Sequence, residues 1–315
     1  MAPRSHVGSI PSPGTAPATG GRTFLIGCLC AISAVTIWAG WIVLTRLSVS
    51  RILGVYDITA LRFSVAGLLL LPVVLRRSGT LRRIGWGGGL IMATGSGAPY
   101  MLLASAGVAL APAAHAGPLL PGIMPLFAAL LSWLVLKEKL LPARILGLGL
   151  ILLGVLSVGG QHLLHSLGDA WMGHLLLMSA AFLWASYTVA LRRLGVAALD
   201  ATAVVSVLSA ALYLPVYILV LPHRLGDAAW EEILFQGLFQ GVGSGIVALV
   251  AYNRAVALIG PSRAASFGAL VPVTAMLTAI PLLDEWPSGL DVAGVVAVSI
   301  GVLLASGGLA ALRRR

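Results

Sequence analysis

The sequence contains one apolar unit twice. Residues 125–138 (PLFAALLSWLVLKE) and residues 272–285 (PVTAMLTAIPLLDE) each begin with Pro and end with Glu, and the residues between are almost all apolar. The glycines that follow recur with the same offset of 147 residues: Gly147, Gly154, Gly294 and Gly301. A unit that recurs at this distance within 315 residues predicts two similar halves that pack into one fold.

Other sparse residues recur in the same order. The matched pairs are Trp38 with Trp184, Trp41 with Tyr187, Arg46 with Arg192, Asp57 with Asp200, and the Gly-Ser-Gly triplets at residues 95–97 and 243–245. The offset within these pairs drifts only between 143 and 148 residues. An ordered series of this kind indicates a duplication rather than chance agreement.

The composition is that of a membrane protein. The chain is 59% hydrophobic and only 10% charged, whereas a soluble domain has about 25% charged residues. The net charge of +10 could suggest a nucleic-acid partner. The basic residues, however, lie in small clusters between apolar runs, so membrane topology explains them and no nucleic acid is expected.

The apolar runs are long enough for ten membrane-spanning helices, each of which needs about 20 residues. In the first half they occupy residues 23–45, 57–75, two parts of the uncharged stretch 84–136 separated by the Pro-rich segment 111–118, and 142–160. In the second half they occupy residues 170–191, 201–221, 233–253, 262–283 and 289–309. We therefore expect an all-α polytopic fold: a disordered tail (1–21), two five-helix repeats (22–160 and 161–309) and a basic C-terminus (310–315).

Five spans are an odd number, so the second repeat must enter the membrane from the opposite side. With both termini inside, the outer loops hold only Arg46, Arg51 and Arg224 among the basic residues. This bias predicts cytoplasmic termini. The preference for Arg over Lys suggests a GC-rich bacterial genome, and the expected location is the inner (plasma) membrane of a bacterial cell. Inverted repeats of this kind commonly build transporters whose substrate site lies near the midplane.

Arg62 is the basic residue that lies farthest inside an expected span, about five residues from its start. An Arg at the centre of a helix costs about 2.5–3.5 kcal/mol on insertion, so it must have a compensating environment. It could anchor a substrate carboxylate in a cavity. It could also form a structural pair with Asp57 or contact a backbone carbonyl.

Aromatic and polar side chains complete the candidate substrate site. The aromatic residues matched between the repeats could be interface anchors or cavity walls, and the polar ones could form a satisfied structural network. The expected substrate-binding residues are Trp38, Trp41, Arg62, Tyr100, Trp184, Tyr187, Gln240, Ser244 and Tyr252.

The remaining polar groups give little support for other chemistry. Glu138 and Glu285 are expected to cap helices or form pairs at the membrane surface, and Lys137, Lys139 and Arg144 stand near Glu138. The pairs His162 with His165, His165 with Asp169 and His223 with Asp227 lack a third metal ligand nearby. Cys28 and Cys30 are two residues apart, so on a helix they point to different faces, and neither a disulfide nor a metal site is expected of them. No nucleotide-binding or hydrolase motif is present, so neither a metal nor a cofactor is expected.

The titratable residues predict a carrier that needs no proton gradient. Every Asp and Glu falls at the end of an expected span or in a loop, and His174 lies near a span end with the other histidines in loops or the tail. Proton-driven carriers commonly place a titrating carboxylate inside the membrane. We therefore expect a facilitator or an exchanger.

The chain resembles the EamA-type members of the drug/metabolite transporter superfamily over roughly residues 24–308. The residues that carry the resemblance are Arg62-Phe63, the turn between residues 252–255 and 264–265, and the segment 125–140 (PLFAALLSWLVLKEKL), with a Gly-rich helix after each Glu. It implies ten helices, cytoplasmic termini, and export or exchange of metabolites such as amino acids. Residues 282–289 (LLDEWPSG) depart from the family pattern, because Asp284 precedes the Glu without a basic neighbour.

The expected function is a secondary transporter, an exporter or exchanger of small amphipathic metabolites, which alternates access to a midplane cavity between the repeats. Its expected partners are the small-molecule substrate and the lipid bilayer, with a possible homodimer. A membrane-embedded acyl or prenyl transferase is the alternative, supported only by the His-x-x-x-Asp pairs. A second alternative is a membrane subunit that does not itself transport.

Overall fold

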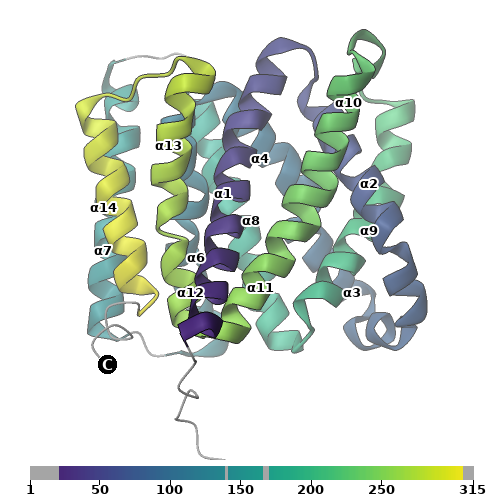
Figure 1. Ribbon diagram of the computed structural model, residues 1–315, viewed down its shortest axis with the longest axis horizontal. Helices are drawn as coiled ribbons and strands as arrows, with labels where there is room; N and C mark the ends of the chain where they lie inside the picture. Colours follow the sequence, from purple (N-terminus) through teal and green to yellow (C-terminus); the bar gives the residue numbers. More distant parts are fainter. Residues whose placement is uncertain (1–20, 139–140, 166–169, 308–315) are drawn as a thin grey trace, which may run out of the picture.

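The computed structural model describes residues 21–138, 141–165 and 170–307, and the regular elements in these ranges are all helices (Figure 1). The first half contains α1 (Gly21–Arg51), α2 (Val55–Arg76), α3 (Ser78–Ser96), α4 (Ala98–Leu110), α5 (Ala113–Gly117), the π-helical η1 (Pro118–Gly122), α6 (Met124–Leu136) and α7 (Pro142–His165).

The second half contains α8 (Ala170–Leu194), α9 (Ala198–Leu219), the 3-10 turn η2 (Leu225–Asp227), α10 (Trp230–Gln236), the π-helical η3 (Gly237–Val247), α11 (Ala248–Ile259), α12 (Pro261–Phe267), α13 (Leu270–Leu283) and α14 (Gly289–Ala305). The expected breaks at the Pro-rich segment 111–118 and at Gly260-Pro261 fall between α4 and α5 and between α11 and α12.

Within the described residues, eight helical segments are long and apolar enough to cross a membrane. Two further expected spans are not among these eight segments. The helix α14 has 17 residues, and the third expected span is divided into α3 and α4 at Gly97. Ser209 explains the division, because its Oγ accepts the Ala98 N–H at 3.2 Å and would lie 2.1 Å from a Cβ at Gly97.

The bundle has two distinct ends (Figure 1). Helix α1 begins and α14 ends at the lower end in this view, which we call the near end. Helix α1 ends and α14 begins at the opposite end, the far end. Exposed Trp86 lies towards the near end, and Trp230 and Trp286 lie at the far end, as in the aromatic belts of membrane proteins.

The two halves interlock. Helix α7 packs most extensively against its counterpart α14, and α2 packs against its counterpart α9. Helix α1 packs on α11 and α13, whereas α8 packs on α3, α4 and α6. A contact that a first-half helix makes with the second half is therefore repeated by its second-half counterpart with the first half. Most of the core is an interface between the halves.

Glycines allow the closest of these approaches. A Cβ at Gly154 would lie 2.6 Å from the Gly294 carbonyl oxygen, and one at Gly147 would lie 2.7 Å from that of Gly301. Backbones this close leave no room for a side chain, so the prediction that these glycines give small faces for helix packing is confirmed.

Candidate functional site

A buried amide organises the polar interior between α1 and η3. The Gln240 side chain, which is 0% exposed, accepts the Trp41 Nε1–H on its Oε1 at 2.8 Å. Its Nε2 donates to Thr45 Oγ1 at 3.1 Å and to Gln236 Oε1 at 3.3 Å. The amide nitrogen thus donates two hydrogen bonds to protein groups and the amide oxygen accepts one, which fixes the orientation of the amide.

Arg62 of α2 reaches the same segment. Its Nη1 donates to the Gln240 carbonyl oxygen at 3.3 Å and to Ser244 Oγ at 3.1 Å. Gly241 permits this approach, since a Cβ there would lie 2.6 Å from Val65 Cβ. The π-helical η3 belongs to a class of distortion that is frequent at functional sites.

The surroundings of Arg62 show which of the two expected structural contacts it makes. The contact with a backbone carbonyl is present, whereas the pair with Asp57 is not. Asp57 Oδ1 instead accepts from Tyr217 Oη at 2.6 Å and from the Arg224 backbone N–H at 3.1 Å. No carboxylate of the described residues forms a salt bridge with Arg62, so its guanidinium retains an unneutralised positive charge.

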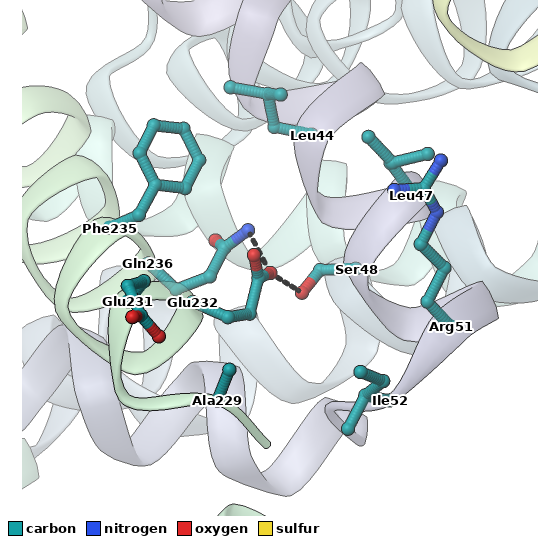
Figure 2. Close-up of a pocket in the computed structure, with 10 residues that line it drawn as sticks. All are labelled: Leu44, Leu47, Ser48, Arg51, Ile52, Ala229, Glu231, Glu232, Phe235 and Gln236. Carbon is teal, nitrogen blue, oxygen red and sulfur yellow. Dashed lines mark hydrogen bonds between the residues drawn. The ribbon is translucent and has the colours of Figure 1, made fainter.

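The hydrogen bonds continue from this centre to a cavity at the far end (Figure 2). Gln236 Nε2 donates to Glu232 Oε1 at 3.2 Å, and Ser48 Oγ donates to the same oxygen at 2.8 Å. The cavity has a volume of about 350 Å³, and its wall includes Leu44, Ser48, Arg51, Glu232, Phe235 and Gln236. A polar path therefore leads from Arg62 to the far end.

The aromatic candidates form two groups, each joining the two halves. Trp184 of α8 packs against Tyr100 of α4 and against Tyr187, with ring centroids 5.1 and 5.5 Å apart. Trp38 of α1 packs against Tyr252 of α11 at 5.3 Å. Tyr100 is also an electrostatic neighbour of Arg62, which links the first group to the polar centre.

The structure thus joins Trp41, Arg62, Gln240 and Ser244 by hydrogen bonds and sets Tyr100, Trp184 and Tyr187 beside them, with Trp38 and Tyr252 as a separate pair. The site prediction omitted four members of the network: Thr45, Ser48, Glu232 and Gln236. A signal for Glu232 and Gln236 exists in the sequence, because polar residues recur every four positions at 232, 236, 240 and 244. That spacing places them on one helical face.

Two ion pairs connect the halves at opposite ends. Glu285 Oε1 accepts from Arg46 Nε at the far end, and Glu138 Oε1 accepts from Arg192 Nη2 at the near end. Each Glu follows a residue in the left-handed conformation, Lys137 with φ 56° and Asp284 with φ 54°. The expectation of surface pairing is met, but the partner of Glu138 is Arg192 rather than Lys137 or Arg144.

The residues considered as metal ligands form no metal site within the described residues. The side chains of His162, His165 and Asp169 lie outside the described residues. Cys28 and Cys30 are free thiols. Among the described residues, no group of three or more His, Cys, Asp or Glu side chains could hold a metal ion.

Comparisons with known proteins agree with this architecture. The sequence pattern of the EamA-like transporter family matches residues 25–160 and again residues 171–307. The chain is 28% identical over 199 residues to the "Uncharacterized transporter YyaM" of Bacillus subtilis (strain 168). That alignment covers 61% of this chain and 64% of the relative, which is less than two thirds of its length.

A solved crystal structure shares the fold. It is similar over 93% of this chain and 98% of its own, with a TM-score of 0.61 and 23% sequence identity. The likeness extends across both halves of the chain.

Proposed function

Because the chain belongs to the EamA-like transporter family, we propose that it is a secondary transporter that exports or exchanges small amphipathic metabolites such as amino acids. The family and the relative's name indicate a multi-pass membrane transporter rather than an enzyme. The observation that carries the finer proposal is Arg62, a cation inside the bundle whose hydrogen-bond partners in the structure are a carbonyl and a hydroxyl.

The chemistry around Arg62 favours a substrate with a carboxylate. Guanidinium binds carboxylate through two parallel hydrogen bonds, and a neutral carbonyl and hydroxyl do not satisfy its charge. Tyr100 and Trp184 add an aromatic surface for an apolar side chain. The substrate-binding residues of this proposal are Trp38, Trp41, Arg62, Tyr100, Trp184, Tyr187, Gln240, Ser244 and Tyr252.

The proposed topology has ten spans, with α3 and α4 crossing together and α14 crossing as the last. The positions of the α1 start and the α14 end at one end of the bundle support an even number of crossings. In this arrangement both termini are cytoplasmic, the near end faces the cytoplasm of a bacterial cell, and the far end faces outward.

The proposed mechanism is alternating access, and the two ion pairs that connect the halves support it. We call the ion pair of Arg46 with Glu285 the far pair and that of Arg192 with Glu138 the near pair. In each pair one residue comes from the first half and the other from the second. Opening one end separates one pair while the other stays closed. A substrate at Arg62 is then reached from one side at a time, as in other inverted-repeat transporters.

Counterflow in proteoliposomes tests the proposal. Vesicles loaded with an unlabelled amino acid should accumulate the labelled one, across a panel of amino acids, more than protein-free vesicles do. The Arg62→Gln variant should transport about 10- to 100-fold more slowly, because a hydrogen bond to a charged group contributes about 1.5–3 kcal/mol. Arg62→Lys should be intermediate, since Lys keeps the charge but not the paired geometry.

Arg193→Gln is the matched control, because Arg193 is exposed at the near end. It should transport at the wild-type rate at equal amounts of monodisperse protein. Unchanged transport by Arg62→Gln would contradict the assigned site. No accumulation of any compound in the panel would contradict the assigned substrate class.

A further inference from the structure

The cavity at the far end carries the opposite charge to the Arg62 centre (Figure 2). It lies where α1 ends and α10 begins, and its wall includes two acidic side chains, Glu231 and Glu232, and one basic side chain, Arg51. Among the described residues, no salt bridge involves any of these three. Two carboxylates and one guanidinium leave the cavity wall with a formal charge of −1, whereas the guanidinium of Arg62 is positive.

Glu232 is positioned by two buried donors. Its Oε1 accepts from Ser48 Oγ at 2.8 Å and from Gln236 Nε2 at 3.2 Å, and the two donor residues are 4% and 2% exposed. Both donors are neutral, so they fix the carboxylate without cancelling its charge. In the part of the chain that the structure describes, no hydrogen bond ends on the second oxygen, Oε2. That oxygen can accept from a cationic donor such as an ammonium group.

Other buried titratable side chains bind one another. His115 lies in the short helix α5 rather than in a loop, so the sequence prediction for this residue is wrong, and it is 1% exposed. Its Nδ1 is 3.0 Å from His174 Nε2, and its Nε2 is 3.0 Å from Asp291 Oδ1. These three residues form a contact between the halves, whereas Glu232 lines a cavity.

The rest of the cavity wall offers an apolar surface. Its apolar members, from α1 and its end and from the start of α10, are Leu44, Leu47, Ile52, Ala229 and Phe235. The volume of about 350 Å³ falls within the range of about 300–1,000 Å³ that is usual for small-molecule sites. Such a cavity suits a ligand that combines an ammonium group with a small apolar body.

The cavity and the Arg62 centre are separate binding places. Glu232 and Ser244, which contacts Arg62, are twelve residues apart on the continuous helical segment Trp230–Ile259. Twelve residues span about 18 Å at the rise of an α-helix, and a free amino acid is shorter than that. One molecule therefore cannot place its ammonium at Glu232 while its carboxylate lies at Arg62.

We propose that the far-end cavity is a second binding site, which holds a small zwitterion with an apolar side chain before or after it occupies the Arg62 centre. Glu232 Oε2 accepts from the ammonium of the ligand, the apolar wall receives its side chain, and Arg51 supplies the counter-charge for its carboxylate. The class of ligand rests on the proposed function, since an amino acid with an apolar side chain carries these three groups.

Protection of a thiol from a maleimide tests the site in the purified full-length protein. Ala229 lines the cavity and is exposed, so the Ala229→Cys thiol should be labelled in a background without Cys28 and Cys30. The probes share one branched tail: leucine, isoamylamine, which lacks the carboxylate, and isocaproate, which lacks the ammonium. Leucine and isoamylamine should slow the labelling as their concentration rises, and isocaproate should not.

A thiol outside the cavity gives the control for this assay. Ser288 is exposed at the far end and is not part of the cavity wall. The Ser288→Cys thiol should therefore react at the same rate with and without each probe. Slowing of both thiols by leucine would overturn the proposal, because the effect would then not be local to the cavity.

Three variants assign the charges. Glu232→Gln should raise the half-protecting concentrations of leucine and isoamylamine by about 10- to 100-fold, the factor that a hydrogen bond to a charged group contributes. Arg51→Gln should raise that of leucine by about fivefold or less, since Arg51 is exposed, and should leave that of isoamylamine unchanged. Asp227→Asn is the matched control, because Asp227 is an exposed acid outside the cavity wall, and it should change neither.

The same assay separates the cavity from the Arg62 centre. Protection of the Ala229→Cys thiol should persist in Arg62→Gln, and its loss there would overturn the proposal. So would equal protection by isocaproate and isoamylamine, an outcome that the wild-type cavity decides even where Glu232→Gln fails to fold.

A lipid headgroup is another source of ammonium, and the membrane composition distinguishes it. Leucine should protect equally in nanodiscs of phosphatidylcholine with and without phosphatidylethanolamine. Protection by phosphatidylethanolamine to which leucine adds nothing would overturn the proposal by assigning the cavity to a lipid. Protection by leucine without counterflow would retain the cavity site and contradict the proposed transport function, and counterflow without protection would do the reverse.

Discussion

At the far end Arg46 of the first half meets Glu285 of the second, whereas at the near end Arg192 of the second half meets Glu138 of the first. The residue types and their repeat positions are the same, with the halves exchanged. The surroundings differ. The side chains of the far pair are 21% and 23% exposed, and those of the near pair are 50% and 32% exposed.

The far pair also has more support. Arg46 Nη1 donates to the carbonyl oxygens of Val108 and Ala109 at 2.9 and 3.2 Å, and Glu285 Oε2 accepts the Ala113 N–H at 2.7 Å. The near pair has a second bond within it, from Arg192 Nη1 to Glu138 Oε2 at 3.5 Å. Among the described residues its side chains bond to one other residue, through Arg192 Nη1 to Ser132 Oγ at 3.3 Å. Exposed pairs contribute about 0–1 kcal/mol, so the comparison teaches that a duplicated sequence can close its two ends with unequal strength.

A second pair of matched residues shows the same difference. Asp57 at the far end is buried and accepts from Tyr217 and from the Arg224 backbone. Its counterpart Asp200 at the near end pairs with the Arg77 side chain at 2.6 Å, and that side chain is 55% exposed. Both comparisons show that the matched groups at the far end are more buried and have more partners than those at the near end.

The largest expected effect concerns which side of the membrane each end faces. In a background without Cys28 and Cys30, single cysteines at Ser78 and Ser262 should react with an impermeant maleimide only from the cytoplasmic side. Cysteines at Ser166 and Ser288 should react only from outside. Labelling of Ser78→Cys and Ser166→Cys from the same side would contradict the inverted repeat, and with it the assignment of the two ends to opposite sides of the membrane.

Glu285→Gln should open the far end. The change removes the charge that holds Arg46, and a hydrogen bond to a charged group contributes about 1.5–3 kcal/mol, or about a 10- to 100-fold change in an equilibrium. A cysteine at Ser48, which is 4% exposed beside the far-end cavity, should therefore be labelled faster from outside by about that factor. Labelling at the rate seen with intact Glu285 would show that the far pair does not hold this end closed.

Trp38→Ala and Trp184→Ala should each reduce counterflow by about tenfold, more than they lower folded yield, because each is a proposed substrate-binding residue that packs on a Tyr of the opposite half. Leu68→Ala is a suitable control, since Leu68 is exposed on α2. Normal transport by both Trp variants at equal membrane levels would make these residues anchors rather than cavity walls.

Glu138→Gln should have the smallest effect, about fivefold or less on near-end accessibility, since exposed pairs contribute about 0–1 kcal/mol. A cysteine at Ser132, which is 1% exposed beside the near pair, reports it through labelling from the cytoplasmic side. Equal effects of Glu138→Gln and Glu285→Gln would mean that the difference in burial between the two ends has no energetic consequence.

The sequence by itself determined the membrane environment, the duplication, the small glycine faces of α7 and α14, and the helix breaks near Pro112 and Pro261. These features are linear: hydropathy, spacing and the conformational limits of Gly and Pro act on neighbouring residues. The nine candidate site residues also came from position alone. Hydrogen bonds join four of them (Trp41, Arg62, Gln240 and Ser244), and ring contacts join three others (Tyr100, Trp184 and Tyr187). Tyr100 links the two groups as an electrostatic neighbour of Arg62, and Trp38 and Tyr252 lie apart.

Only the tertiary structure decided which groups meet. The partner of Glu138 is Arg192 rather than an adjacent Lys, and Asp57 binds Tyr217 rather than Arg62. His115, His174 and Asp291 come together from three distant helices. Side-chain partners depend on how helices from the two halves cross, and a periodic apolar pattern fixes the buried face of a helix without specifying what lies opposite each polar group.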